Sequence, residues 1–224
     1  MSLRLAVWSG PRNLSTAMMR SWAQRSDTAV VDEPLYAHYL ATTGIDHPGR
    51  DEVIASQPTD AAVVTASLVG PVPDGKAVHY QKHMTHHLLP DVPRAWMAHV
   101  RHAFLLRDPR EVLLSYVRSR EAVTVEDLGV PQQEAILAEV DALGQDPVVI
   151  DAGRFLRDPE GQLRIWCARE GLRFEPAMLA WAPGSRPEDG VWGRHWYASL
   201  WASTGFERWK DRDRTIPPRH RDLI

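Results

Sequence analysis

Short apolar runs alternate with helix-like segments along most of this chain. The runs that favour β-strands fall at residues 3–8, 28–32, 61–66, 77–82, 102–107 and 147–151, and apolar residues recur with helical spacing near residues 14–26, 109–121, 131–143 and 159–171. Strands that alternate with helices are typical of a parallel sheet covered by crossover helices. The pattern therefore predicts an α/β fold with three layers, α/β/α, around a mainly parallel central sheet.

The chain length fits one such domain. A chain of 224 residues can bury a substantial core, and neither an internal repeat nor a low-complexity linker divides residues 1–224. The composition changes from Trp181 onward, where Trp, Gly and Pro are frequent before a polar tail. We expect residues 181–224 to form a C-terminal cap, with a tail that is draped over the domain or partly disordered. Its tryptophans can pack the cap on the sheet, line a pocket, or do both; they are Trp181, Trp192, Trp196 and Trp201.

Charge and cysteine content narrow the function classes. The chain has 26 Lys and Arg against 29 Asp and Glu, a formal net charge of −3, so no overall basic field favours nucleic acid. No apolar run approaches the roughly 20 residues that span a bilayer, and the apolar start is too short for a secretory signal. The single cysteine, Cys167, excludes an internal disulfide and reads as a packed core thiol. We expect a cytoplasmic protein with a local small-ligand site.

The stretch VWSGPRNLSTAMMRSW predicts an anion-binding loop. A strand that ends in a glycine turn at Gly10 and feeds a helix presents free backbone N–H groups and the positive end of the helix dipole. Arg12 adds a permanent cation, and Asn13, Ser15 and Thr16 add neutral donors. The alternative is an ordinary turn in which Asn13 or Ser15 caps the helix.

A second anion signal lies in HAFLLRDPREVLLSYVRSR. Arg107 ends a predicted strand, and Ser115 follows eight positions later inside the next helix. Both side chains can reach one phosphate group if the chain folds back between them. The alternative is a local Arg107–Asp108 pair and an ordinary helical serine.

Together, the two stretches resemble the sulfotransferases that use 3′-phosphoadenosine-5′-phosphosulfate (PAPS). That family has a loop after its first strand, usually Lys-Ser-Gly-Thr-Thr, and a later LRDPR…S element. Here Arg12 stands in place of the lysine and Leu14 in place of the glycine, and VVIDAGRFLRDPEGQLRIWCAREGL resembles the late strand and helix of the family. The resemblance implies a P-loop nucleoside triphosphate hydrolase-like sulfotransferase fold with PAPS as donor. The donor-binding residues that it implies are Gly10, Arg12, Asn13, Leu14, Ser15, Thr16, Arg107 and Ser115.

The acceptor of a sulfuryl group must lose a proton, so the site needs a base. Glu33 follows the second predicted strand, and Lys82 and His83 follow a later one. Strand C-termini meet at the ligand crevice of such folds. The resemblance implies that Glu33 or His83 is the base and that Lys82 stabilises the leaving phosphate. Each is alternatively a solvated or capping polar group. No motif separates a carbohydrate, lipid, phenol or small-amine acceptor.

Other functions remain as alternatives. The run TAVVDE is similar to the strand and aspartate that position magnesium in kinases and ATPases, but the first loop lacks their lysine. A sulfuryl group in transfer carries less negative charge than a phosphoryl group, so no metal is expected. The histidines that suggest a metal site lack a carboxylate or cysteine spaced to complete it; they are His79, His83, His86 and His87. A non-catalytic nucleotide-binding protein is the other alternative.

Overall fold

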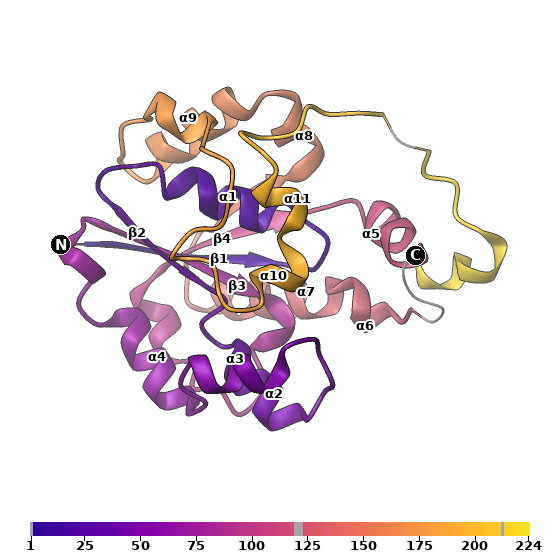
Figure 1. The fold of residues 1–224 in the computed structure, drawn as a ribbon, viewed down its shortest axis with the longest axis horizontal. Coiled ribbons are helices and arrows are strands. Elements are labelled where there is room, and N and C mark those ends of the chain that lie inside the picture. The colour runs from indigo at the N-terminus through magenta and orange to yellow at the C-terminus, as the bar shows by residue number, and fades with distance from the viewer. Residues whose placement is uncertain (1, 119–122, 212) are drawn as a thin grey trace.

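In a computed structural model of the protein, five parallel strands form the centre of the molecule (Figure 1). The structure describes residues 2–118, 123–211 and 213–224. The strands are β1 Leu3–Ser9, β2 Thr28–Asp32, β3 Val78–Met84, β4 Arg101–Leu106 and β5 Val148–Asp151. They pair in the order β2-β3-β1-β4-β5, with every pairing parallel. The order reverses at β1, which places a crevice outside the strand ends beside it.

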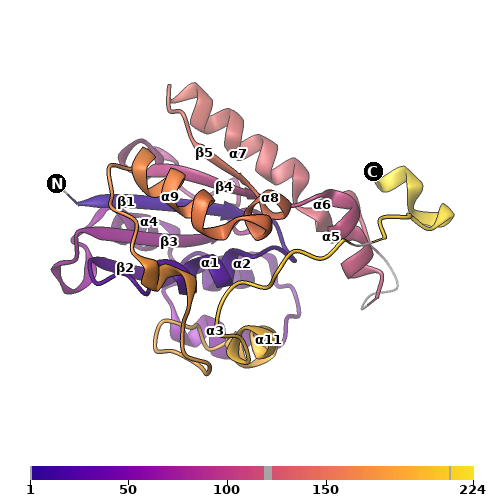
Figure 2. The same cartoon turned by 90° about the horizontal axis from the view of Figure 1, so that it is seen from above.

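Helices cover both faces of the sheet, which confirms the three-layer α/β prediction. One face carries α1 Ser15–Trp22, α8 Ala152–Arg157 and α9 Pro159–Arg169, and the other carries α4 Ala61–Val69, η3 Ala95–His99 and α7 Val130–Ala142. Figure 2 shows the same layers from above. The remaining helices lie in the connections between these elements or in the C-terminal segment: α2 Tyr36–Thr43, α3 Arg50–Ser56, η1 Pro73–Gly75, η2 Thr85–His87, α5 Pro109–Tyr116, α6 Val125–Leu128, η4 Pro176–Leu179, α10 Gly193–Trp196, α11 Ala198–Trp201 and η5 Pro218–Leu223.

Strand alternation divides the core in two. Leu5 and Val7 of β1 pack with α1, α8 and α9, whereas Ala6 and Trp8 pack with α4 and α7. Successive side chains of a strand point to opposite faces, so a strand buried on both sides reads as a continuous apolar run. This explains why the β1 run is apolar without a polar alternation.

The expected strand at residues 61–66 is wrong, because this segment is helix α4. Asp60 caps it by accepting hydrogen bonds from the amides of Ala62 and Val63. The buried positions are Ala61, Val64, Thr65 and Leu68, which is the spacing of one helical face. A short apolar run does not separate a buried strand from a buried helix, whereas the Asp60 cap does.

The other predicted elements are found, with shifted ends. The expected helix at 14–26 ends at Trp22, and that at 109–121 ends at Tyr116, with residues 119–122 outside the described part of the chain. β3 continues to Met84, so Lys82 and His83 lie within the strand rather than after it. No helix in the described residues has the length and apolar content needed to cross a membrane.

The C-terminal segment lies against the domain. An isolated bridge joins Ala180 to Gly205, and α10 and α11 lie over the C-terminal ends of the strands. The described part of the tail ends in η5, where Ile216 and Leu223 pack beside the cluster of Val112, Leu113 and Leu128. Among the tryptophans of this segment, Trp181 and Trp192 are buried, whereas Trp196 is exposed.

Three histidines are buried in the face of the sheet that carries α4 and α7. Trp8 Nε1 donates to His102 Nδ1 at 3.0 Å, so His102 is a neutral ring whose Nε2–H donates to the carbonyl of Met97 at 2.9 Å. Burial lowers the pKa of His79 to about 4 and that of His83 to about 3. The folded protein therefore holds these rings without charge at neutral pH.

We predict that acid weakens the fold through these rings. The pKa values of these rings in the folded state lie below the usual 6.5, so the unfolded chain binds protons first as the pH falls below about 6.5. From there, each ring lowers the free energy of unfolding by about 1.4 kcal/mol per pH unit until its folded pKa is reached. His83→Phe, which keeps a flat ring beside Trp8, should reduce this slope in urea unfolding between pH 6 and 4. The same substitution at exposed His99 is the control, and equal slopes in the two variants would contradict the assignment.

Candidate active site

A cavity of about 720 Å³ opens at the C-terminal ends of the strands. The loop after β1, the end of β3, the start of α5 and the C-terminal segment all contribute to its walls. Most of the residues that the sequence predicted for the site line this cavity: Arg12, Asn13, Leu14, Ser15, Thr16, Glu33, Lys82, Arg107 and Ser115. Segments far apart in the chain meet here because parallel strands direct their C-termini to one edge.

The loop after β1 and the α5 element are in direct contact. Arg12 Nε donates to Ser115 Oγ at 2.9 Å, and the guanidinium of Arg107 donates to the carbonyl oxygen of Arg12. Asn13 Nδ2 donates to the carbonyl of Leu105 at 2.8 Å, which fixes the loop on β4. The two predicted anion-binding stretches therefore form one surface.

Helix α1 begins at this surface without a side-chain cap hydrogen bond. Asn13 Oδ1 accepts from the amide of Leu14, which precedes the helix, and Ser15 is the first helical residue. The amides of the first turn, including that of Thr16, thus have no side-chain acceptor in the cap. An anion bound in the cavity would meet these amides and the positive end of the helix dipole.

Gly10 has a packing role. A Cβ at this position would lie 3.2 Å from the carbonyl oxygen of Leu128 and 3.8 Å from Gly129 Cα, so glycine lets the loop approach the α6–α7 corner. Gly10 does not line the cavity, unlike Leu14. Its predicted contribution to donor binding is therefore indirect, through the path of the loop.

Arg107 belongs to a charged cluster. Its Nε lies 3.2 Å from Glu111 Oε2, while Arg214 of the tail donates to Glu111 Oε1 at 2.9 and 2.7 Å. Two guanidinium groups share one carboxylate, which leaves one positive charge in excess among these three side chains. Arg214 is a cation of this region that the sequence patterns did not indicate, because no spacing links the tail to α5.

Lys82 is buried at the junction of β2, β3 and the C-terminal segment. Its ammonium donates to Asp32 Oδ1 at 2.7 Å, to Glu33 Oε1 at 2.6 Å and to the Tyr197 hydroxyl at 2.8 Å. The Tyr197 hydroxyl donates to Asp32 Oδ2 at 2.6 Å and accepts from Trp192 Nε1 at 3.0 Å. A lysine has three N–H groups, and all three are used here. A leaving phosphate would reach Lys82 only by displacing one of these acceptors.

The charges in this network depend on one another. Burial by itself lowers the pKa of Lys82, but Asp32 and Glu33 together raise it well above its usual value. Burial raises the pKa of Asp32, and Lys82 opposes that shift. Burial and the neighbouring Asp32 also raise the pKa of Tyr197, which stays protonated as a donor.

The two candidate bases lie on opposite sides of the sheet. Glu33 follows β2 and lines the cavity, whereas His83 is fully buried, with its ring stacked on Trp8 at 4.6 Å between centroids. Lys82 and His83 are consecutive in β3, so they must face opposite ways. Glu33 and Arg12 also have positive φ values, 42° and 56°, a strained conformation that often occurs at functional sites. The geometry therefore favours Glu33.

Glu33 uses its two oxygens differently. Oε1 is held by Lys82, whereas Oε2 lies 3.8 Å from His87 Nδ1, a buried nitrogen without a hydrogen-bond partner. Burial and the nearby His86 and Lys82 lower the pKa of His87 well below its usual value, so its ring is neutral. The sequence placed His87 only among possible metal ligands. In the described residues, no group of three or more His, Cys, Asp or Glu side chains could hold a metal ion.

The sequence as a whole matches a known family. The family model described as "Sulfotransferase domain" matches residues 3–222. The chain belongs to the sulfotransferase domain family. Two Arabidopsis thaliana relatives, branched-chain-amino-acid aminotransferase-like proteins 1 and 2, are 40% and 36% identical over 97% of this chain. This sulfotransferase-type chain spans 39% of the length of each of them.

Solved sulfotransferases share the fold. The sulfotransferase domain from the curacin biosynthetic pathway matches with a TM-score of 0.55 and 17% identity, over 85% of this chain and 81% of that one. A sulfotransferase from Alicyclobacillus acidocaldarius matches with a TM-score of 0.56 and 15% identity, over 90% and 92% of the two chains. The α/β architecture of the family is therefore present here, and the chain is a transferase-family domain.

We predict that Lys82 is essential for stability. Lys82→Met leaves Asp32 buried without its cation, which should lower the free energy of unfolding by about 3–5 kcal/mol. The double variant with Asp32→Asn should lose less, because the uncompensated charge is gone. Urea denaturation measures both. The control is Lys76→Met, since Lys76 makes only an exposed hydrogen bond to the Ser26 carbonyl; a Lys82→Met loss no larger than this control would contradict the prediction.

Proposed function

We propose that this protein is a PAPS-dependent sulfotransferase that transfers a sulfuryl group to a hydroxyl or amine group of an acceptor. The observation that carries the proposal is the contact between the loop after β1 and the α5 element in one cavity, through Arg12, Arg107 and Ser115. Family membership supports the reaction class. The donor and the roles of individual residues are our proposal.

The donor would lie across the contact between the two elements. The first-turn amides of α1, together with Arg12, Ser15 and Thr16, would bind the 5′-phosphosulfate. Arg107 and Ser115 would bind the 3′-phosphate, and the excess positive charge of the Arg107 cluster would favour a dianion.

The chemistry follows from this placement. The acceptor oxygen forms a bond to sulfur as the bond between sulfur and the bridging phosphate oxygen breaks, and 3′-phosphoadenosine 5′-phosphate (PAP) leaves. Glu33 Oε2 takes the acceptor proton. Arg12 and the α1 amides stabilise the charge that develops on the leaving phosphate. Lys82 holds Glu33 Oε1 and keeps the carboxylate oriented.

The kinase alternative requires a free carboxylate to position magnesium. Asp32 is the residue that the sequence offers for this role, but its two oxygens accept from Lys82 and Tyr197 and it is buried. We therefore expect PAP, and not ATP with magnesium, to raise the melting temperature in a thermal-shift comparison. Stabilisation by magnesium ATP alone would instead support the kinase.

We predict that Arg107 provides most of the preference for the 3′-phosphate. Arg107→Ala should remove a charge-assisted contact worth about 1.5–3 kcal/mol and weaken PAP binding accordingly, with little effect on the analogue that lacks the 3′-phosphate. Calorimetry measures both affinities. Arg110→Ala is the matched control, because Arg110 lies three residues after Arg107, at the start of α5, but pairs with Asp108. Undiminished preference in Arg107→Ala would place the 3′-phosphate elsewhere.

We predict that Glu33 acts on the acceptor and not on the donor. Glu33→Gln should leave the Kd for PAP nearly unchanged while single-turnover transfer from PAPS falls by about 10²–10⁴-fold. Arg12→Ala should instead impair both donor binding and transfer. The transfer is measured with the compound that the wild-type chain sulfates fastest in a panel of alcohols, phenols and amines. An unimpaired single-turnover rate in folded Glu33→Gln would remove Glu33 from the mechanism.

A further inference from the structure

One side of the cavity is built from rings that touch one another. Tyr36 stacks on His87 with 4.6 Å between centroids and 9° between planes, and its hydroxyl hydrogen-bonds to His47 Nδ1 at 2.9 Å. The ring centroids of His47 and Trp196 are 6.3 Å apart, and those of His86 and His87 are 4.4 Å apart. All five residues line the cavity, and we call them the aromatic wall.

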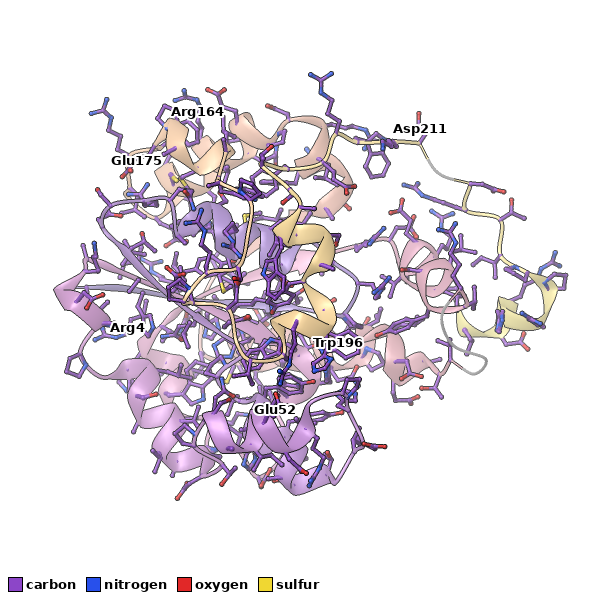
Figure 3. All side chains as sticks on the ribbon, viewed as in Figure 1. Arg4, Glu52, Arg164, Glu175, Trp196 and Asp211 are labelled. Atoms are coloured by element: carbon purple, nitrogen blue, oxygen red, sulfur yellow. The ribbon has the colours of Figure 1, made fainter. Side chains whose placement is uncertain are left out.

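Two members of the aromatic wall present groups that could contact a ligand. Trp196, the last residue of α10 and labelled in Figure 3, is 47% exposed. A large apolar ring exposed at a cavity is typical of a ligand contact. His87 is only 2% exposed, yet its Nδ1 has no hydrogen-bond partner and faces Glu33 Oε2. A buried polar atom without a partner is costly unless a ligand satisfies it.

The charges beside the aromatic wall favour an uncharged ligand. The charged groups beside it include Glu33, Asp32 and Lys82, and the one ammonium of Lys82 binds both carboxylates. A carboxylate or phosphate on the acceptor would be repelled by Glu33 and Asp32, whose two charges Lys82 only half balances, and the neutral ring of His87 would not offset this. An alkyl ammonium, the usual form of an amine at neutral pH, would bring no lone pair to react.

We propose that the aromatic wall is the acceptor site, and that the acceptor is an uncharged, flat-ringed compound that carries a hydroxyl group. The ring lies against Trp196 and Tyr36, and the hydroxyl reaches Glu33 Oε2 beside His87 Nδ1. The hydroxyl proton passes to Glu33, and the oxygen receives the sulfuryl group from PAPS as PAP is released. This inference rests on the proposed sulfotransferase activity.

The test compares ring compounds of similar size that differ from one reference compound in charge, or in ring shape together with the acidity of the hydroxyl group. Para-ethylphenol is neutral and flat, tyramine carries an ammonium, para-hydroxyphenylpropionate carries a carboxylate, and para-ethylcyclohexanol is neutral but not flat. With PAPS as donor and the sulfated product measured by mass spectrometry, kcat/KM for para-ethylphenol should exceed that of each of the others by about tenfold or more. Equal or higher values for a charged or non-flat compound would overturn the proposal.

A variant of the aromatic wall tests the site itself. Trp196→Ala should lower kcat/KM for para-ethylphenol by about tenfold, because the ring loses its stacking surface, while the Kd for PAP stays unchanged. Because Trp196 is exposed, we expect Trp196→Ala to fold normally, and its melting temperature checks this. Ile165→Ala is the matched control, since Ile165 is 65% exposed on α9 and does not line the cavity. Equal effects of the two substitutions would overturn the proposal.

The outcomes separate this inference from the activity on which it rests. If the wild-type chain does not bind PAP, the proposed function fails and the acceptor proposal fails with it. If PAP binds and Arg107→Ala weakens it but none of the four compounds is sulfated, only the acceptor proposal fails. Sulfation of para-ethylphenol that depends on Trp196 supports both.

Discussion

The buried ammonium of Lys82 is the interaction on which the organisation of the site depends. It joins the end of β2, through Asp32 and Glu33, to β3 and to Tyr197 of the C-terminal segment. Moving a charge out of water costs several kcal/mol, so this arrangement is stable only with its acceptors in place. The C-terminal segment thus supplies hydrogen bonds that the core requires, in addition to apolar surface.

A second ion pair holds the same segment from the other side. Nη2 of Arg20 in α1 lies 2.9 Å from each carboxylate oxygen of Asp189, and both side chains are almost fully buried. Trp201 Nε1 also donates to Asp189, at 2.8 Å. Because α10 and α11 lie between Asp189 and the end of the segment, these contacts fix the helices that bring Trp196 and Tyr197 to the cavity.

The two sides of the cavity differ in their electrostatics. Cations and helix amides gather where the loop after β1 meets α5, whereas the aromatic wall is built from packed rings next to Lys82 and its two carboxylate partners. Such a division suits a transfer between a highly charged donor and a neutral acceptor. The reacting groups would meet between Arg12 and Glu33, the two cavity residues whose backbones have positive φ.

Some features of the site were readable from local sequence, because they depend on periodicity and on strand ends. The apolar runs predicted the five strands, and the position of Glu33 after β2 and of Arg107 after β4 placed them at the crevice edge. The prediction of a strand at 61–66 was wrong, because the apolar residues of this run suit a buried strand and a buried helix equally well. The prediction that His83 follows its strand was wrong for another reason. β3 ends two residues later than predicted, so His83 lies within the strand and its side chain points into the core.

The sequence by itself determined the α/β class and the family, and it predicted the two candidate anion-binding stretches, since each of these depends on local patterns in contiguous segments. Only the tertiary structure decided which polar groups are neutralised and which are available. The partners of Lys82, the cluster of Arg107 with Arg214, and the approach of His87 to Glu33 all join residues from separate elements. Spacing along the chain carries no information about such contacts, because burial and charge compensation depend on the packing of the whole domain.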